Sequence, residues 1–383
     1  MRKFLIGCIA LSITAASSCK PSKMSNNKEY VLAGTYTAGN ASGGIYLYDF
    51  DEDSGTLNPV FHTENIFNPS YLALTKDEKY LYAVNENTDA NTKGGVSAFA
   101  FDNRTGNINF LNSQLSNGDA PCFVSVDSTG KNVFVANYNG GNFSVYKTND
   151  SGKLSPAVQI IAHSGTSANK KIQTQSHVHS TFLSPDEKYL FVCDLGNDTL
   201  YQYPFNANDV KPVNEANAKK YKVSAGFGPR HLVFSPNKKF VYLLNELEAK
   251  IIAYSFQNDS LTYLQTVTST DVEDTANADK GSAAIRISPN GKFLYASNRG
   301  KANDITIFKI KEDGTLQEVA HVPTDKHPRD FNISPNGKFL LVAARDDNSI
   351  KIYKINEQTG LLTYTQHSVT LPMPVALIFA TKK

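Results

Sequence analysis

The feature that most restricts the fold of this chain is a unit that recurs about every fifty residues. Its mark is a Ser-Pro-Asn-Gly-Lys-like turn before an apolar strand, as in SPDEKYLFV (184–192), SPNKKFVYL (235–243), SPNGKFLYA (288–296) and SPNGKFLLV (334–342). Two degenerate copies are TKDEKYLYA (75–83) and DSTGKNVFV (127–135). A period of this length, with four short strands in each copy, is typical of the blades of a β-propeller.

Six copies are anchored at Thr75, Asp127, Ser184, Ser235, Ser288 and Ser334, which lie 52, 57, 51, 53 and 46 residues apart. A seventh copy is divided between the chain ends. MPVALIFA (373–380) has the pattern of an innermost strand, whereas YVLAGTYT (30–37) and GGIYLYDF (43–50) have that of outer strands. We therefore predict an all-β, seven-bladed β-propeller over residues 29–383, with four antiparallel strands per blade and a ring closed by pairing of the N- and C-terminal strands.

The first residues have the layout of a targeting signal. Arg2 and Lys3 precede an apolar run over residues 4–16, which is too short to span a membrane. Small residues stand directly before Cys19, as in a bacterial lipoprotein signal. We expect a signal peptide over residues 1–18, lipid attachment at Cys19, a polar tether over residues 19–28, and a location in the periplasm or at the outer membrane. The alternative is an ordinary cleaved signal with an incidental cysteine.

Charge and motifs exclude several classes of function. Removing Arg2 and Lys3 from the 38 basic residues leaves 36, equal to the 36 acidic residues, so the chain lacks the positive surface of a nucleic-acid-binding protein. No Gly-x-Ser-x-Gly, His-Glu-x-x-His, Walker or Gly-x-Gly-x-x-Gly motif is present, which disfavours serine esterases, zincins and nucleotide enzymes. Cys122 and Cys193 are expected to be buried free thiols.

Equivalent positions in the blades locate a candidate site. Five residues before each anchor, at the start of the innermost strand, stand Ser70, Cys122, His179, Arg230, Ala283 and Arg329, with Val375 in the divided blade. Eleven residues after each anchor, at the end of the second strand, stand Glu86, Tyr138, Leu195, Glu246, Arg299 and Arg345. Pseudo-symmetry places both sets at one mouth of the central channel. Their charges suit an anionic or polyoxygenated ligand, although a solvated rim or structural ion pairs are the plainer explanation.

Two histidines raise the question of a metal. His177 and His179 alternate along one strand and so point the same way, and with His231 they form a conceivable set of ligands. We expect neither a metal nor another cofactor, because no metal motif of known spacing is present and Arg230 would repel a cation.

These repeats and rim residues together resemble the seven-bladed lactonase family, which includes propeller-type 6-phosphogluconolactonases of bacteria and carboxymuconate lactonising enzymes of fungi. The resemblance covers residues 30–380 and is carried by Asn137-Tyr138, Ser176-His177-Val178-His179, Asp194-Leu195-Gly196, Gly228-Pro229-Arg230-His231, Asn245-Glu246-Leu247, Asn298-Arg299-Gly300 and His327-Pro328-Arg329. A histidine, a glutamate and two arginines are implicated in the site of the muconate-type relatives. By motif, the resemblance implies that these are the His177/His179 pair, Glu246, Arg230 and Arg299.

The sequence thus predicts hydrolysis of a sugar-derived lactone, with His179 or Glu246 as the base and Arg230 and Arg299 as oxyanion donors. The residues expected to contact the substrate are His177, Arg329, Arg345, Glu86, Tyr138, His231 and Asp194. One alternative is cyclisation of a carboxymuconate-type diacid. Another is a non-catalytic propeller that binds a glycan or a protein, which predicts an exposed aromatic patch instead of a charged site.

Overall fold

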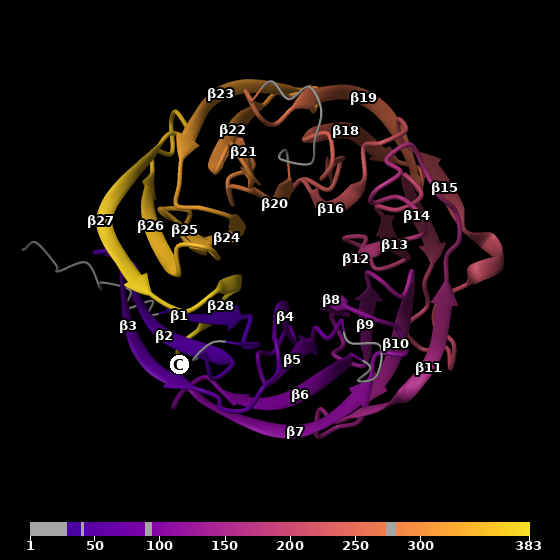
Figure 1. The fold of residues 1–383 in the computed structure, drawn as a ribbon, viewed down its shortest axis with the longest axis horizontal. Helices are drawn as coiled ribbons and strands as arrows, with labels where there is room; N and C mark the ends of the chain where they lie inside the picture. The colour runs from indigo at the N-terminus through magenta and orange to yellow at the C-terminus, as the bar shows by residue number, and fades with distance from the viewer. Residues whose placement is uncertain (1–28, 40–41, 89–93, 273–280) are drawn as a thin grey trace, which may run out of the picture.

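The computed structural model describes residues 29–39, 42–88, 94–272 and 281–383, so the expected signal peptide, Cys19 and the whole expected tether lie outside the described residues. Seven four-stranded antiparallel sheets surround a central opening (Figure 1). The predicted seven-bladed β-propeller is confirmed. No helix in the described ranges is long and apolar enough to cross a membrane.

Each blade runs from an innermost strand at the channel outward. The innermost strands are β28 (Pro374–Thr381), β4 (Leu72–Leu74), β8 (Pro121–Val126), β12 (Val178–Leu183), β16 (Pro229–Phe234), β20 (Ser282–Ile287) and β24 (Pro328–Ile333). The second strands are β1 (Glu29–Thr35), β5 (Tyr80–Asn85), β9 (Asn132–Asn137), β13 (Tyr189–Asp194), β17 (Phe240–Asn245), β21 (Phe293–Asn298) and β25 (Phe339–Ala344).

The outer half of each blade is built in the same way. The third strands are β2 (Ile45–Asp51), β6 (Gly95–Asp102), β10 (Asn142–Thr148), β14 (Thr199–Pro204), β18 (Lys250–Gln257), β22 (Asp304–Ile310) and β26 (Ser349–Ile355). The outermost strands are β3 (Thr56–His62), β7 (Asn107–Leu115), β11 (Leu154–Ala162), β15 (Lys219–Lys222), β19 (Ser260–Thr268), β23 (Leu316–Pro323) and β27 (Leu362–Thr370). A short 3-10 helix, η1 (Glu215–Asn217), precedes β15.

The ring closes where the two ends of the chain share a blade. β1 pairs antiparallel with β28, with Tyr30 opposite Ala380 and Val31 opposite Phe379. The backbone N–H of Lys383 then donates to the carbonyl of Asn103 in the next blade at 3.0 Å. Neither terminal strand is left as an unpaired edge.

The repeated turn has a local cause. Between β20 and β21, the Ser288 hydroxyl donates to Asn290 Oδ1 at 2.7 Å and accepts the N–H of Phe293 at 3.0 Å. Gly291 has a φ of 73°, which glycine adopts without strain. The hydroxyl therefore satisfies the backbone while the glycine reverses the chain, which accounts for the recurrence of this turn.

Seven apolar clusters hold the blades together, and each lies between two neighbouring sheets. In one of them, Leu32 of β1 and Leu81 of β5 are fully buried beside Phe99 of β6. Because both faces of each sheet are covered, the strands carry apolar residues on both sides. Cys122 and Cys193 are buried free thiols, as expected.

Candidate active site

Most innermost strands have a bulge near their start that turns one side chain toward the channel mouth. In β12 the pairing with β13 passes from Val178 directly to Ser180, so His179 is an extra residue in the ladder. The same interruption occurs at Cys122, Arg230 and Arg329. Bulges re-aim side chains and are common beside active sites. They are the structural reason that the residues five positions before the anchors gather at one place.

The second strands end at the same mouth. Glu86 follows β5, Tyr138 follows β9, Glu246 follows β17 and Arg299 follows β21. The divided blade contributes Tyr36, which directly follows β1. Sequence reasoning missed Tyr36 because no anchor turn precedes β1 in the chain. Counting one residue beyond each second strand would have found it.

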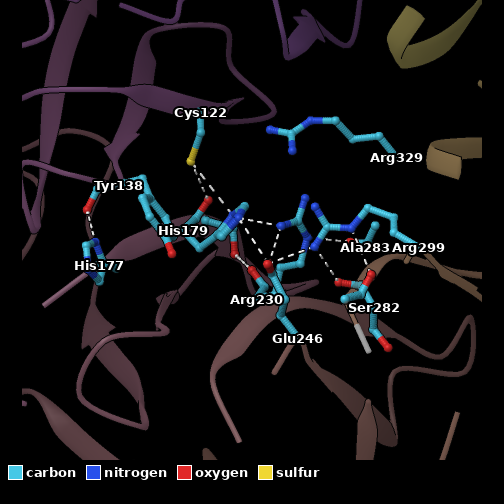
Figure 2. A network of polar contacts seen from close by, with 12 residues as sticks. Cys122, Tyr138, His177, His179, Arg230, Glu246, Ser282, Ala283, Arg299 and Arg329 are labelled. Carbon is cyan, nitrogen blue, oxygen red and sulfur yellow. Dashed lines mark hydrogen bonds and ion pairs between the residues drawn. The ribbon is translucent and has the colours of Figure 1, made fainter. Parts of the chain in front are cut away.

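Glu246 lies between two arginines. Its Oε1 is 2.8 Å from Nη2 of Arg299, and its Oε2 forms a short ion pair with Nη1 of Arg230 (Figure 2). Backbone carbonyls hold both cations from behind: Arg230 Nε donates to Ala283 at 2.7 Å and Arg299 Nε to Gly281 at 2.8 Å. Burial alone would raise the pKa of Glu246, but Arg299 and Arg230 hold this pKa well below its usual range. The carboxylate is therefore ionised at physiological pH.

His179 completes this cluster. Its Nε2 lies 2.6 Å from Nη1 of Arg230 and 3.7 Å from Oε2 of Glu246, and its Nδ1 lies 3.8 Å from Sγ of Cys122. The ring of Tyr138 meets it edge-on, with centroids 5.3 Å apart. Burial, together with the charge of Arg230, lowers the pKa of His179 well below its usual value. The imidazole is therefore neutral at physiological pH.

A second cluster surrounds Glu86. The Tyr36 hydroxyl lies 3.1 and 3.0 Å from its two carboxylate oxygens, and the Ser70 hydroxyl donates a short hydrogen bond to Oε2. Arg329 is held more loosely, because its Nη2 is 3.8 Å from Oε2 of Glu86. Its guanidinium carbon lies 5.3 Å from the centroid of the Tyr36 ring, a cation–π contact. Burial raises the pKa of Tyr36 above its usual value, so the phenol stays a donor.

The guanidinium groups keep donors for a ligand. In the described part of the chain, Nη2 of Arg230 and Nη1 of Arg299 have no hydrogen-bond partner, and Arg329 makes only a loose ion pair and a ring contact. Figure 2 shows the guanidinium of Arg329 extending toward the other two. These three cations face two carboxylates, Glu246 and Glu86, so one positive charge is uncompensated. Such an array suits an oxyanion.

A layer of aromatic rings lies beside these positions, in which Tyr71, Phe123 and His231 come one residue after Ser70, Cys122 and Arg230, and Phe182 comes from β12. Tyr71 stacks on Phe123 with centroids 4.1 Å apart, and Phe182 and His231 lie 4.9 and 5.4 Å from the same Phe123 ring. His231 also meets His179 edge-on at 5.5 Å. These rings border the charged cluster with material of low polarity, which strengthens its electrostatic interactions.

His231 belongs to this layer, and its expected contact with the substrate stays a prediction. The residue is 3% exposed, and both of its ring nitrogens are buried without a hydrogen-bond partner among the described residues. Burial and the charge of Arg230 lower its pKa well below the usual value. Both nitrogens are thus covered within the protein.

The buried histidines predict a loss of stability in mild acid. Burial also lowers the pKa of His327, to about 3. Because the pKa values of His179, His231 and His327 lie below the value of about 6.5 in an unfolded chain, the unfolded state binds more protons below pH 6.5. Stability is then complete above pH 6.5 and falls by about 1.4 kcal/mol per pH unit for each histidine as the pH decreases.

His231→Leu should remove one such contribution and relieve two unpaired buried nitrogens. We expect the free energy of unfolding at pH 7 to rise by about 1 kcal/mol and its slope between pH 6.5 and 5 to become shallower. Urea unfolding at several pH values measures both quantities. His62→Leu, at a half-exposed rim position, is the control and should leave the slope unchanged. A wild-type slope in His231→Leu would contradict this assignment.

His177 is bound on both sides by the protein itself, and its expected contact with the substrate stays a prediction. Its Nδ1 and Nε2 each lie 2.9 Å from a backbone carbonyl, those of Tyr138 and Ile172, and its ring stacks on Tyr138 at 4.3 Å. Both ring nitrogens are thus used within the protein. The nitrogens of His179 face Arg230 and a thiol instead, so the two imidazoles do not converge on a shared ion.

Asp194 and Arg345 also lie outside the cluster. Asp194 Oδ1 accepts the N–H of Gly196 at 3.0 Å, and Oδ2 lies 3.0 Å from Nδ1 of His163, so the carboxylate serves the turn after β13. The expected contact of Asp194 with the substrate stays a prediction. Arg345 Nε donates to Asp346 at 2.6 Å, and its side chain is 28% exposed, which places it on the rim beside the cluster.

Known proteins share this fold over nearly its full length. The family model described as Lactonase, 7-bladed beta-propeller, matches residues 30–379. A 6-phosphogluconolactonase of Formosa agariphila is 36% identical over 335 residues, 87% of this chain and 94% of that protein. The 6-phosphogluconolactonase of Bacillus subtilis is 30% identical over 348 residues, 90% and 97% of the two chains. The structure of the periplasmic gluconolactonase of Pseudomonas aeruginosa matches with a TM-score of 0.86 at 31% identity, covering 93% and 100%.

Proposed function

Because this chain belongs to the family of seven-bladed β-propeller lactonases, we propose that it hydrolyses a sugar lactone at the mouth formed by His179, Arg230, Glu246 and Arg299. The observation that carries the proposal is an ionised carboxylate held between two buried guanidinium groups that retain unused N–H donors. Relatives named as 6-phosphogluconolactonase and gluconolactonase support the substrate class.

In the proposed reaction the arginines bind the lactone carbonyl. Nη2 of Arg230 and Nη1 of Arg299 donate to the carbonyl oxygen, which gains negative charge as water attacks the carbon. The uncompensated positive charge of the cluster stabilises this oxyanion more than the neutral substrate. Preorganised donors of this kind typically supply the largest share of acceleration in acyl transfer.

Glu246 is the group we propose as proton acceptor for the attacking water. Its carboxylate is ionised at all pH values of interest, whereas the Nε2 lone pair of His179 already accepts a hydrogen from Arg230. A carboxylate so stabilised is a weak base, so we expect proton removal to contribute near the low end of the ~10²–10⁴ range. When the ring C–O bond breaks, Glu246 returns the proton to the leaving oxygen. The product acid then ionises and releases a proton.

The charge balance predicts a preference for a lactone without a phosphate. The oxyanion takes up the one uncompensated positive charge of the cluster, and a phosphate would add a charge of about −1.5 to −2 near Glu86 and Glu246. Glu86→Gln removes one of these negative charges. We expect it to raise the kcat/KM ratio of 6-phosphogluconolactone to gluconolactone about tenfold. Proton release with both lactones measures the ratio.

Glu64→Gln is the matched control for this charge change, because Glu64 is 76% exposed on the outer rim. It should leave the ratio within about twofold, since screening weakens distant exposed charges. A wild-type protein that prefers the phosphorylated lactone, with a ratio unaffected by Glu86→Gln, would refute the charge-balance argument while leaving lactone hydrolysis in place.

Cyclisation of a carboxymuconate-type diacid is a second candidate, favoured by one observation. Among the described residues, Arg329 is held only by a loose ion pair and a ring contact, so it offers a bidentate site for a second carboxylate. Incubating the same preparation with a muconate and with gluconolactone separates the two reactions. The non-catalytic reading predicted an exposed aromatic patch, whereas the channel mouth carries a largely buried charged cluster.

We further propose that the protein is a lipoprotein outside the cytoplasm. The basic start, the short apolar run and the small residues before Cys19 support this, as does a relative named periplasmic. β1 begins at Glu29 on the face opposite the mouth that Tyr36 enters, so a tether from Cys19 would leave the site facing away from the membrane. Fatty-acid labelling of wild type and Cys19→Ser tests the anchor, and an unlabelled wild type would exclude it.

A further inference from the structure

The contact between Arg230 and His179 shows where the imidazole hydrogen lies. A guanidinium has only donors, so Nη1 of Arg230 donates to Nε2 of His179 across 2.6 Å and Nε2 carries no hydrogen. The neutral imidazole must then carry its hydrogen on Nδ1. This tautomer is assigned from donors and acceptors, as it is for any histidine whose hydrogens are not seen.

Nδ1 of His179 faces the thiol of Cys122 on the neighbouring blade. The sulfur lies 3.8 Å from Nδ1 and 3.4 Å from the carbonyl oxygen of His179 itself. Burial raises the pKa of Cys122 well above its usual value, so the sulfur keeps its hydrogen. The thiol gives this hydrogen to the carbonyl and has only lone pairs left for Nδ1. The hydrogens of the pair are therefore arranged consistently: sulfur donates to the carbonyl, and Nδ1 donates to sulfur.

We propose that Cys122 is a positioning residue that holds His179 as its Nδ1–H tautomer and, through His179, fixes Arg230 for the oxyanion. The other blades support a side-chain-specific role. Ser70 and Ala283 occupy the equivalent places, and Ser70 likewise binds a member of the site, Glu86. In the opposite tautomer an Nε2–H would point at the N–H of Arg230, and Arg230 would lose one of its three acceptors.

Nitrogen NMR of the full-length protein labelled with [15N]histidine tests the assignment without a substrate. The His179 signals are identified by their loss in His179→Gln. We expect the wild type to show a protonated Nδ1 and a bare Nε2, and Cys122→Ser, which keeps a donor and an acceptor, to show the same. Cys122→Ala should populate the other tautomer. An Nε2–H in the wild type, or an unchanged Nδ1–H in Cys122→Ala, would overturn the proposal.

A second test of the same proposal uses enzyme kinetics, and it rests on the proposed lactonase activity. We expect Cys122→Ala to lower kcat about five- to tenfold with KM within about twofold, and Cys122→Ser to restore kcat to within about threefold. Cys193→Ala is the matched control, because Cys193 is also a buried free thiol but packs in the apolar cluster with Phe191 and Leu232. The positioning role of Cys122 would be contradicted if the Cys122→Ala protein retained full kcat while the Cys122→Ser protein did not. A protein inactive on every lactone leaves the NMR result to decide.

Discussion

Replacing Arg230 by alanine is expected to slow lactone hydrolysis by about 10²–10³-fold, mainly through kcat. Arg230 contacts three groups of the site: His179 Nε2, Glu246 Oε2 and the Ala283 carbonyl fix its plane, and Nη2 remains for the substrate. The substitution removes an oxyanion donor and also the hydrogen-bond partner of His179 and Glu246. Initial rates of proton release, corrected for spontaneous hydrolysis, measure the effect.

Two further variants sharpen this test. Arg230→Lys keeps the charge but lacks the planar fork that reaches three acceptors, so we expect it to recover only a small part of the lost rate. Arg104→Ala removes an arginine that is 73% exposed in the turn after β6, at the face opposite the site, and should behave as wild type. If Arg230→Ala stays within threefold of wild type, Arg230 does not stabilise the transition state.

Replacing Glu246 by glutamine is expected to lower kcat by at least about 10²-fold and to lower the free energy of unfolding by about 3 kcal/mol. The substitution leaves Arg230 and Arg299 facing each other without a counter-charge, and the amide places N–H donors opposite their own. We place the value at the low end for buried pairs because the Glu246 side chain is 17% exposed. Urea unfolding at pH 7 measures it.

Glu86→Gln is the matched control for the stability effect. Its amide oxygen still accepts from Tyr36 or Ser70, and Arg329 is only loosely paired with it, so a loss of about 1 kcal/mol or less is expected. Equal losses for the two variants would mean that Glu246 is no more tightly coupled to its arginines than Glu86 is. An unchanged midpoint in Glu246→Gln would contradict the account of the cluster directly.

The fold was predictable because its cause is local and repeated. The turn that contains Ser288 and Gly291 recurs with small changes, and each copy indicates a hairpin at a fixed place in a blade. The divided blade followed from the lack of an innermost strand before residue 30. No long-range information was needed, because neighbouring blades pack alike.

The site residues could be predicted only where they occupy equivalent positions in the repeated blades. Equal register brought His179, Arg230, Glu246 and Arg299 together, but the cause, a bulge that frees the side chain at the start of most innermost strands, is invisible in sequence. Tyr36 was missed because the divided blade offers no anchor from which to count.

The directions of the His177 and His231 side chains could not be predicted from the motifs. Each is adjacent to a site residue in a motif, yet the strand turns His177 toward two backbone carbonyls and His231 into the aromatic layer. A motif predicts which part of the molecule a side chain lies in. The direction of the side chain depends on which residue of the strand forms the bulge.

The most direct test of the central proposal is proton release by the purified wild-type protein with gluconolactone and with 6-phosphogluconolactone, after subtraction of spontaneous hydrolysis. We predict a rate far above the background with gluconolactone, and its near disappearance in a folded Arg230→Ala protein. A wild-type rate equal to the background with both lactones, or an Arg230→Ala protein as active as wild type, would contradict hydrolysis of a sugar lactone at this channel mouth.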